Sequence, residues 1–479
     1  MMTRTHLGIL AGLFLMTLFV AGAAAEVPVN ATPNGTAGAV PTPSATVEVL
    51  WQQTYGAGSN LTFLSLLPGR EDEPVLVGAD PGSGDLVLVR ANGTGVLLDQ
   101  QRVPFGPGNT GWPIAVSPIP DGGLVAVGSA RSVAPGDEDV LLLRLRADGA
   151  PVWSRTYAIG TGVDRGTAVL PVADGGLLVA GTTVPPTGGT TDLLLLRLDP
   201  AGGEVWHRIV PIGGRNLAVS DLRPATGGGY LLVGSTDADR PGTSAVLLAL
   251  ITEDGSKAWQ RTYASSSGPA RGVTLVPGSN GGYLLLAVVG GPVMETSGTV
   301  LIGVDTDGRE RWRRVPGGDA LTPVVGRALT AVDQRGYLVA GEIGGAGASR
   351  SLLTMVDREG RVAWNGSWSV GEGTADRARA VLVSGPDRYL LAGETVPAEG
   401  GRSALYLAAV KVGTLAPNAT ANVTPGTPGT PTETPSPSPL PPPPGTTPVP
   451  TTTAAPAGCG PVLGGLVAAA CLLASPRRR

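Results

Sequence analysis

The chain has 479 residues, with 73 glycines and 44 prolines, and only 15% of its residues are charged. This composition excludes a charge-rich disordered protein and is typical of an all-β fold with many turns. A net charge of −4 gives no broad basic surface, so we expect no nucleic-acid partner.

Residues 1–25 have the pattern of a secretory signal peptide. Arg4 gives a positive start, an apolar stretch runs from Leu7 to Val20, and Ala23–Ala25 is a small-residue cleavage site. An uncleaved membrane anchor is the alternative. Both predict an extracellular body, and we expect residues 26–44 to be a disordered N-terminal segment.

A repeat of about 53 residues fills the body of the chain. Tryptophan recurs once per repeat, and an apolar run that ends in glycine, such as LLVAG ending at Gly181, recurs in the same register. The tryptophans are Trp153, Trp206, Trp259, Trp312 and Trp364. Two markers with one period indicate a repeat architecture, and the period is close to that of a propeller blade.

Residues 166–208 show how one repeat is built. Short apolar runs of strand length are separated by two glycine turns, at Asp174–Gly176 and Asp199–Gly202. Glycine accepts the positive φ that tight hairpins need, and the runs are too short for helices. Each repeat therefore predicts four antiparallel strands.

The two ends of the repeat array predict a closed ring. The last repeat has only three strands, and residues 45–56, which contain Trp51, look like the missing fourth one. With Leu97 as the substituted residue of the first repeat, there are seven fourth strands. We predict that residues 45–414 form a seven-bladed β-propeller closed by its N-terminal strand, which removes open sheet edges.

These DGGYLVAG…LLRLDxxGxxxW units resemble those of secreted prokaryotic propeller proteins and, more distantly, quinoprotein-type propeller repeats. The second resemblance implies a docking motif around the tryptophan. Quinoprotein rings usually have eight blades, and the enzymes place polar groups around a quinone and a calcium ion. This chain has seven units and no adjacent cysteines, which argues against a redox role. A relative of the quinoproteins that binds no cofactor is the remaining interpretation of this resemblance.

We predict a binding face on the side of the ring that carries the connections between second and third strands. These connections are long and varied, whereas the other turns are tight, and variable loops on a rigid scaffold are where binding resides. The predicted residues on this face are Arg131, Asp237, Asp239, Arg240, Glu295 and Arg350.

A second group stands near the start of the first strand, where the mouth of a central channel would lie. Its members are Arg165, Arg271, Arg327, Arg377 and, in an equivalent place, Trp112. Guanidinium groups suit oxyanions, so this group predicts an anion or carboxylate-sugar site. Pairing with neighbours such as Asp164 and Asp376 is the alternative.

Three other features have a structural and a functional interpretation. We predict that the repeated tryptophans pack between neighbouring blades; Trp112 and Trp368, outside that series, are either core residues or exposed aromatics for a ligand. The Asp-x-x-Gly turns at Asp199, Asp305 and Asp357 could suggest calcium loops, but turn geometry alone explains them, and we predict that they are structural.

The C-terminal end has two parts. Residues 415–457 are rich in Thr and Pro and predict an extended, disordered stalk. Residues 458–479 contain Cys459-Gly460-Pro461, an apolar stretch and three arginines, and resemble archaeal surface-protein sorting signals. That resemblance implies that Cys459 is a processing or lipid-attachment point; a plain short anchor is the alternative, although the apolar stretch falls short of the ~20 residues that span a bilayer.

Sequons for N-glycosylation fit an exported chain. They are at Asn30, Asn34, Asn60, Asn92, Asn365, Asn418 and Asn422.

Residues for acid–base or thiolate chemistry are scarce. Only His207 lies in the body besides the histidine of the signal, and Cys459 and Cys471 both lie in the tail. We therefore predict no catalytic residue, no metal ligand and no cofactor. The sequence favours a monomeric, non-enzymatic, membrane-tethered surface protein that contacts an extracellular protein or glycan; an extracellular glycan-active enzyme and a cofactor-free quinoprotein-like scaffold are the alternatives.

Overall fold

The computed structural model of the chain describes residues 46–69, 73–106, 111–131, 136–160, 162–212, 216–237, 243–279, 281–290, 297–316, 324–345, 348–397 and 400–413. The chain divides into two compact units, Met1–Asn418 and Ala419–Arg479, and all described residues belong to the first. The predicted signal peptide, N-terminal segment, stalk and sorting signal, including Cys459, lie outside the described residues.

All regular structure in the described ranges is β-strand, which confirms the all-β prediction, and these ranges therefore contain no helix that could cross a membrane. Four sheets have four consecutive antiparallel strands each. They are β2 (Thr62–Leu67), β3 (Val75–Ala79), β4 (Leu86–Ala91) and β5 (Leu97–Val103); β14 (Ala218–Pro224), β15 (Tyr230–Thr236), β16 (Ala245–Ile251) and β17 (Lys257–Tyr263); β18 (Ala270–Pro277), β19 (Tyr283–Gly290), β20 (Ser297–Val304) and β21 (Glu310–Arg314); and β22 (Val324–Val332), β23 (Gly336–Gly345), β24 (Ala348–Val356) and β25 (Val362–Trp368).

Two further sheets differ from this pattern. One has eight strands, β6 (Gly111–Pro118), β7 (Leu124–Arg131), β8 (Glu138–Leu145), β9 (Pro151–Tyr157), β10 (Val163–Pro171), β11 (Leu177–Val184), β12 (Asp192–Leu198) and β13 (Glu204–Val210). Its halves are joined by a single parallel bridge between Val163 and Glu138. The other combines the two ends of the described chain, in the order β1 (Val47–Tyr55), β28 (Ala404–Val412), β27 (Arg388–Pro397) and β26 (Thr374–Gly385).

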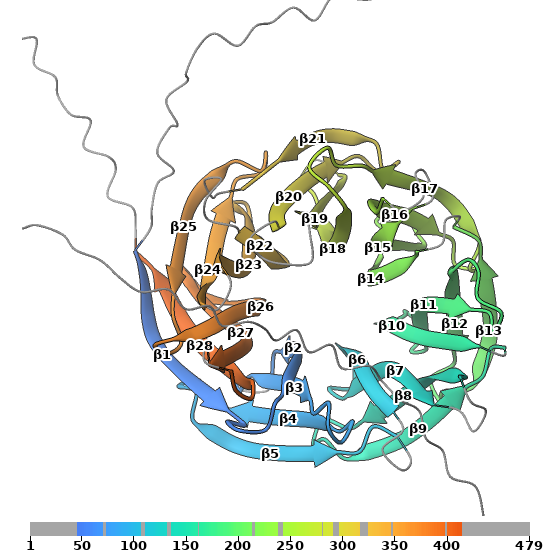
Figure 1. Ribbon diagram of the computed structural model, residues 1–479, viewed down its shortest axis with the longest axis horizontal. Helices are drawn as coiled ribbons and strands as arrows, with labels where there is room; N and C mark the ends of the chain where they lie inside the picture. Colours follow the sequence, from blue (N-terminus) through green and yellow to red (C-terminus); the bar gives the residue numbers. More distant parts are fainter. Residues whose placement is uncertain are drawn as a thin grey trace, which may run out of the picture. The chain divides into compact units, whose positions relative to one another are not determined.

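The four-stranded sets follow one another around a common centre (Figure 1). The innermost strands are β2, β6, β10, β14, β18, β22 and β26, which we call the inner strands. Each contacts the next in this series, and β26 also contacts β2. The inner strands therefore form a continuous circuit of contacts.

The antiparallel order gives the sheets two unlike edges. The hairpins between first and second and between third and fourth strands lie at one edge, which we call the turn face. The connections between second and third strands, and those from one set to the next, lie at the opposite edge, which we call the connection face.

The core lies between neighbouring sheets, because the second and third strands bury side chains on both of their sides. One buried cluster contains Leu76 and Val87 from β3 and β4 together with Leu405 and Leu407 from β28. Burial of each such side chain contributes up to about 2 kcal/mol. The sheet that holds both ends of the described chain is therefore packed against the sheet that follows β1.

The repeated tryptophans pack against the turn of the next sheet, which confirms the packing prediction. A Cβ added to Gly308, whose φ is +73°, would lie 2.8 Å from the ring of Trp259. Only glycine allows this approach. The pairs are Trp51 with Gly95, Trp153 with Gly202, Trp206 with Gly255, Trp259 with Gly308 and Trp312 with Gly360.

The prediction that Leu97 replaces the tryptophan of the first repeat is wrong by two residues. Asp99 lies opposite Arg90, as Trp153 lies opposite Arg144 in the next set. The same register shift follows the turn in both sets, so Leu97 corresponds to Pro151, which lies two residues before Trp153. Trp368 is 7% exposed and belongs to the core, so its structural interpretation is confirmed.

Candidate functional site

Every inner strand carries a bulge at the same place, where one residue has no partner on the second strand. The bulge residues are Leu64, Ile114, Thr167, Ser220, Val273, Arg327 and Arg379. A bulge redirects the side chain of the extra residue. In two consecutive sheets this redirected side chain is an arginine.

The four arginines that the sequence placed together do not occupy one register. Arg165, Arg271 and Arg377 precede the bulge by two positions, and Trp112 shares their place. Arg327 is itself a bulge residue, so the prediction of its equivalence is wrong. Its true counterpart is Arg379, which the sequence analysis missed; aligning Gly326 with Ala378 would have found it.

Two buried glutamates neutralise part of this arginine group. Glu342 on β23 is fully buried and accepts a hydrogen bond from Arg327 Nε at 2.9 Å and another from Arg377 Nε at 3.2 Å. Glu394 holds the equivalent position on β27 and accepts from Arg379 at 3.1 Å. Burial shields these pairs from solvent, so they fix the arginines in place.

Glu394 also connects two sheets. Its second oxygen accepts a hydrogen bond from the backbone N–H of Phe63 on β2 at 2.7 Å. The side chain thus bridges the sheet of β26–β28 and the sheet of β2–β5.

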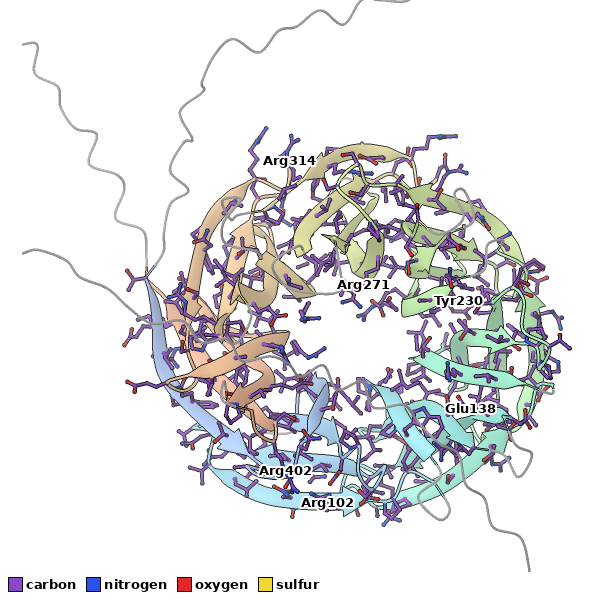
Figure 2. The ribbon with its side chains drawn as sticks, in the orientation of Figure 1. Arg102, Glu138, Tyr230, Arg271, Arg314 and Arg402 are labelled. Carbon is purple, nitrogen blue, oxygen red and sulfur yellow. The ribbon has the colours of Figure 1, made fainter. Side chains whose placement is uncertain are left out.

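Arg271 has no ion pair or hydrogen bond among the described residues, and its side chain is exposed. Figure 2 shows it on the inner side of the sheets, toward the common centre, whereas Arg314 lies at the outer rim. Loss of hydration lowers the pKa of Arg271, and the positive charges of Arg327 and Arg379 lower it further. The three arginines therefore lie near one another on β18, β22 and β26.

Arg165, Arg327 and Arg377 do pair with nearby carboxylates, but Asp164 and Asp376, the partners that the alternative prediction named, are not among them. Asp376 is fully buried and accepts from Val370 N at 2.7 Å and from Thr395 Oγ1 at 2.6 Å. Asp164 accepts from Ile159 N at 3.3 Å. Both carboxylates hold the incoming connection instead of an arginine.

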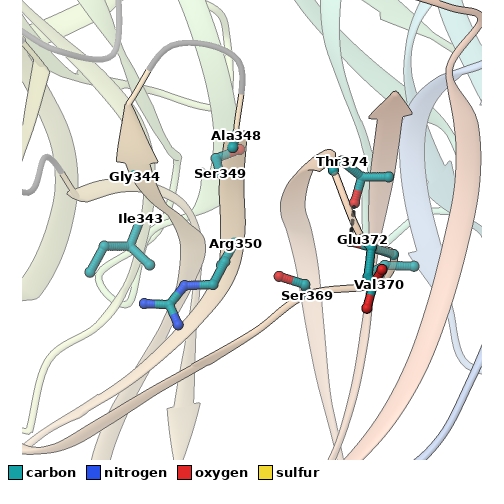
Figure 3. Close-up of a pocket in the computed structure, with 11 residues that line it drawn as sticks. Ile343, Gly344, Ala348, Ser349, Arg350, Ser369, Val370, Glu372 and Thr374 are labelled. Atoms are coloured by element: carbon teal, nitrogen blue, oxygen red, sulfur yellow. Dashed lines mark hydrogen bonds between the residues drawn. The ribbon is translucent and has the colours of Figure 1, made fainter. Parts of the chain in front are cut away.

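A pocket of about 590 Å³ opens on the connection face beside this group. Figure 3 shows Ile343 and Arg350 on one wall and Ser369, Glu372 and Thr374 on the other. The lining residues are Ile343, Gly344, Ala348, Ser349, Arg350, Ser369, Val370, Gly371, Glu372, Gly373 and Thr374. None of them is aromatic.

The pocket and the arginine group are close to each other. Ile343 directly follows Glu342, and Thr374 precedes Arg377 by three positions, or about 10 Å along a strand. Arg350 and Glu372 are exposed and have no ion pair or hydrogen bond within the described part of the chain. Two unpaired charges of opposite sign therefore face solvent in this pocket.

The other predicted binding-face residues have varied surroundings. Arg131 stacks over the ring of Trp112 at 5.7 Å. Arg165 pairs with Glu138 at 2.8 Å. Asp237 is buried and accepts from Asn216 N at 3.1 Å and Nδ2 at 2.8 Å, so it holds a connection. Asp239, Arg240 and Glu295 lie outside the described residues.

Three of the predicted glycosylation sites lie in described ranges. Asn60 is exposed, whereas Asn92 and Asn365 are half-buried. Asn92 Oδ1 accepts from the backbone of Thr94 and Val96 at 3.0 and 2.9 Å, which stabilises its turn. Asn30, Asn34, Asn418 and Asn422 lie outside the described residues.

Comparison with known proteins shows which family and which solved structures the repeats resemble. A family profile described as the outer membrane protein assembly factor BamB matches residues 191–421. An ulvan lyase of polysaccharide lyase family PL25, solved with a -[GlcA(1-4)Rha3S]- ligand, has a similar fold, with a TM-score of 0.50 and 9% identity over 74% of this chain and 96% of the lyase. Residues 191–421 therefore resemble the BamB family.

Other structures with similar propeller folds are more distant. Prolyl oligopeptidase B from Galerina marginata gives a TM-score of 0.42 at 10% identity and covers 75% of this chain; the repeats span about half of the peptidase, or 52%. YCF48 bound to a D1 peptide gives 0.43 at 13% identity, covering 78% of this chain and 99% of YCF48. No curated protein sequence is significantly similar to this chain.

The described residues do not fit the calcium ion that quinoprotein-type enzymes use. Within these ranges no group of three or more His, Cys, Asp or Glu side chains is arranged to hold a metal ion. The turn aspartates are engaged locally: Asp305 accepts from Arg309 N at 2.8 Å and Asp357 from Arg361 N at 2.7 Å, while Asp199 accepts from Gly203 N at 2.7 Å. His207 contacts Glu204 at 2.7 Å on an exposed strand.

Proposed function

We propose that residues 45–414 form a seven-bladed propeller closed by β1. Three observations support this count. The eight-stranded sheet is joined only by the Val163–Glu138 bridge and divides into two blades. β1 pairs with β28 from Val47 to Tyr55. The inner strands contact one another in a circuit that includes β26 with β2.

We propose further that this ring is exported and held at the cell surface. The charged start, apolar stretch and small-residue site of residues 1–25 support export. The motif around Cys459, the apolar stretch and the terminal arginines support tethering through the tail. The BamB description of the matching family agrees with a role at the cell envelope.

In this position the ring acts as a non-enzymatic binding protein for an extracellular glycan or protein, and we place the contact on the connection face. The observation that carries this proposal is the open pocket with the unpaired Arg350 and Glu372, next to the arginine group of the inner strands. The lining offers hydroxyl, guanidinium and carboxylate groups, and it has the size of a small-ligand pocket. We favour a glycan because hydroxyl, guanidinium and carboxylate groups, which hydrogen-bond sugar hydroxyls, line it.

An oligosaccharide array tests this function. We expect the full chain to retain a subset of glycans, Arg350→Ala to weaken that binding about tenfold, and Arg388→Ala, an exposed arginine on the turn face, to leave it unchanged. If both variants lose glycan binding equally, the glycan does not bind on the connection face. If the chain cleaves a bound glycan to shorter products, the protein is a glycan-active enzyme, which is the alternative function.

A further inference from the structure

The inner strands hold more positive than negative charge at the connection face. Three of the four arginines, Arg327, Arg377 and Arg379, pair with Glu342 and Glu394. With the buried Asp376 beside Arg377, the group has three carboxylates against four guanidinium groups. The chain as a whole has a net charge of −4. This group is therefore a local basic site on an acidic protein.

One arginine of the group lacks the partner that its counterpart has. Arg377 pairs with Glu342, which lies on the second strand of the preceding sheet. Arg271 holds the same position on β18, but the residue equivalent to Glu342 in the sheet before it is Ser235. The arginine is present where the glutamate is absent, so its guanidinium is free to bind a ligand.

A second unsatisfied donor belongs to Arg379. Its Nε atom is buried and has no hydrogen-bond partner, although its Nη2 atom pairs with Glu394. Buried donors are nearly always satisfied in proteins, by protein, water or ligand. The free Arg271 and the free donor of Arg379 lie on two inner strands that flank β22, which carries Arg327.

Resting on the proposed function, we infer that Arg271, Arg327 and Arg379 bind a carboxylate or sulfate group of an acidic glycan. The planar guanidinium matches such oxyanions with two parallel hydrogen bonds. Glu342 and Glu394 hold Arg327 and Arg379 in place before the ligand arrives, so little side-chain freedom is lost on binding. The hydroxyl-lined pocket beside them receives the neighbouring sugar rings.

An acidic peptide is the competing ligand, since it offers the same carboxylates. The pocket argues against it, because its larger apolar lining residues are only Ile343 and Val370. Peptide contacts usually depend on buried aromatic or aliphatic anchors. A glycan needs the polar groups that this lining supplies.

Calorimetric titration of the full chain separates these possibilities. The probes are an oligogalacturonate, a sulfated oligosaccharide, a neutral oligosaccharide of equal length and an oligoglutamate peptide. We expect one acidic oligosaccharide to bind with an affinity that falls as salt rises, and the neutral one to bind at least tenfold more weakly.

Variants assign the site. Arg271→Gln is expected to weaken acidic-glycan binding tenfold or more, Arg271→Lys is expected to recover it in part, and Arg388→Gln on the turn face is expected to change nothing. Circular dichroism and the melting temperature check that each variant is folded.

Each other outcome overturns the inference in a distinct way. Acidic and neutral glycans that bind alike, with no effect of Arg271→Gln, refute the anion site and leave the proposed function standing. Arg271-dependent binding of oligoglutamate alone refutes the glycan. Binding of no glycan at all refutes both the inference and the glycan form of the proposed function.

Discussion

The hydroxyl of Tyr55 donates a hydrogen bond of 2.6 Å to the carbonyl oxygen of Gly95, in the turn between β4 and β5. Tyr157 makes the same contact with Gly202, and Tyr263 makes it with Gly308. Burial raises the pKa of Tyr55 to about 12, so the hydroxyl remains a donor at all physiological pH values. The N-terminal strand is thus attached to the sheet that follows it, just as the internal fourth strands β9 and β17 are attached to the sheets that follow them.

Removal of this strand should open the ring. Deletion of residues 46–55 leaves the edge of β28 unpaired and removes the packing of Trp51 on Gly95. We expect the shortened chain to lose its cooperative thermal transition and to aggregate, because exposed strand edges pair between molecules. A synthetic peptide of residues 45–56, added in trans, should restore the transition, and a scrambled peptide is the control. A shortened chain that melts like the wild type would contradict closure by β1.

Contact between tryptophan and glycine should make one Gly→Ala substitution far more costly than another. Gly308 and Gly58 both have positive φ, +73° and +82°, but only Gly308 has an aromatic ring within 4 Å of an added Cβ. Gly58→Ala should cost about 1 kcal/mol from the backbone alone. Gly308→Ala should cost roughly 2–3 kcal/mol more, because the ring of Trp259 must move. Denaturant unfolding measures both, and equal losses would mean that the packing contributes little.

A buried carboxyl group should make stability depend on pH. Asp139 is 8% exposed and one of its oxygens has no partner, so burial raises its pKa, and the charges of Asp137 and Asp164 raise it further. The folded state therefore favours the protonated form. The stability that this proton provides is complete below the ordinary pKa and is lost as pH rises through the raised one.

Two amide substitutions read out this effect. Asp139→Asn should raise the melting temperature at pH 7, and the gain should shrink toward pH 4. The control Asp148→Asn should instead lower it slightly at pH 7, because hydrogen bonds from Ala150 N and from Arg146 lower the pKa of Asp148. A gain for Asp139→Asn that is the same at both pH values would show that its ionisation is not the cause.

Loss of the shared carboxylate should destabilise the ring more than loss of an exposed one. Glu342→Gln leaves Arg327 and Arg377 without their buried counter-charge and should cost roughly 3 kcal/mol. The control, Glu138→Gln, removes the exposed pair with Arg165 and should cost less than about 1 kcal/mol. Chemical denaturation of the two variants gives the comparison. Similar costs would show that burial of Glu342 adds nothing to the pair.

Much of the fold could be predicted from the sequence because its signals are local and repeated. The spacing of Trp153, Trp206 and Trp259, with a glycine turn in every repeat, predicted four-stranded units and the packing between them. The place of Asp99 was missed because no tryptophan marks it, although it corresponds to Trp153 in the next set.

The candidate site was predictable only in part. Arginines near the start of the first strands were visible in the sequence, but their partners were not, because Glu342 and Glu394 come from the next strand. Arg379 was overlooked because Ala378 stands where three other inner strands have a glycine, as Gly326 does before Arg327. Asp164 and Asp376, adjacent to arginines in the chain, turn their carboxylates to backbone N–H groups instead.

A crystal structure of the full chain with a bound acidic oligosaccharide tests the account most directly. We predict a carboxylate or sulfate oxygen within about 3 Å of the Arg271 guanidinium, with the adjoining sugar in the pocket beside Arg350. A ligand seated on the turn face, with Arg271 making no contact to it, would contradict the account.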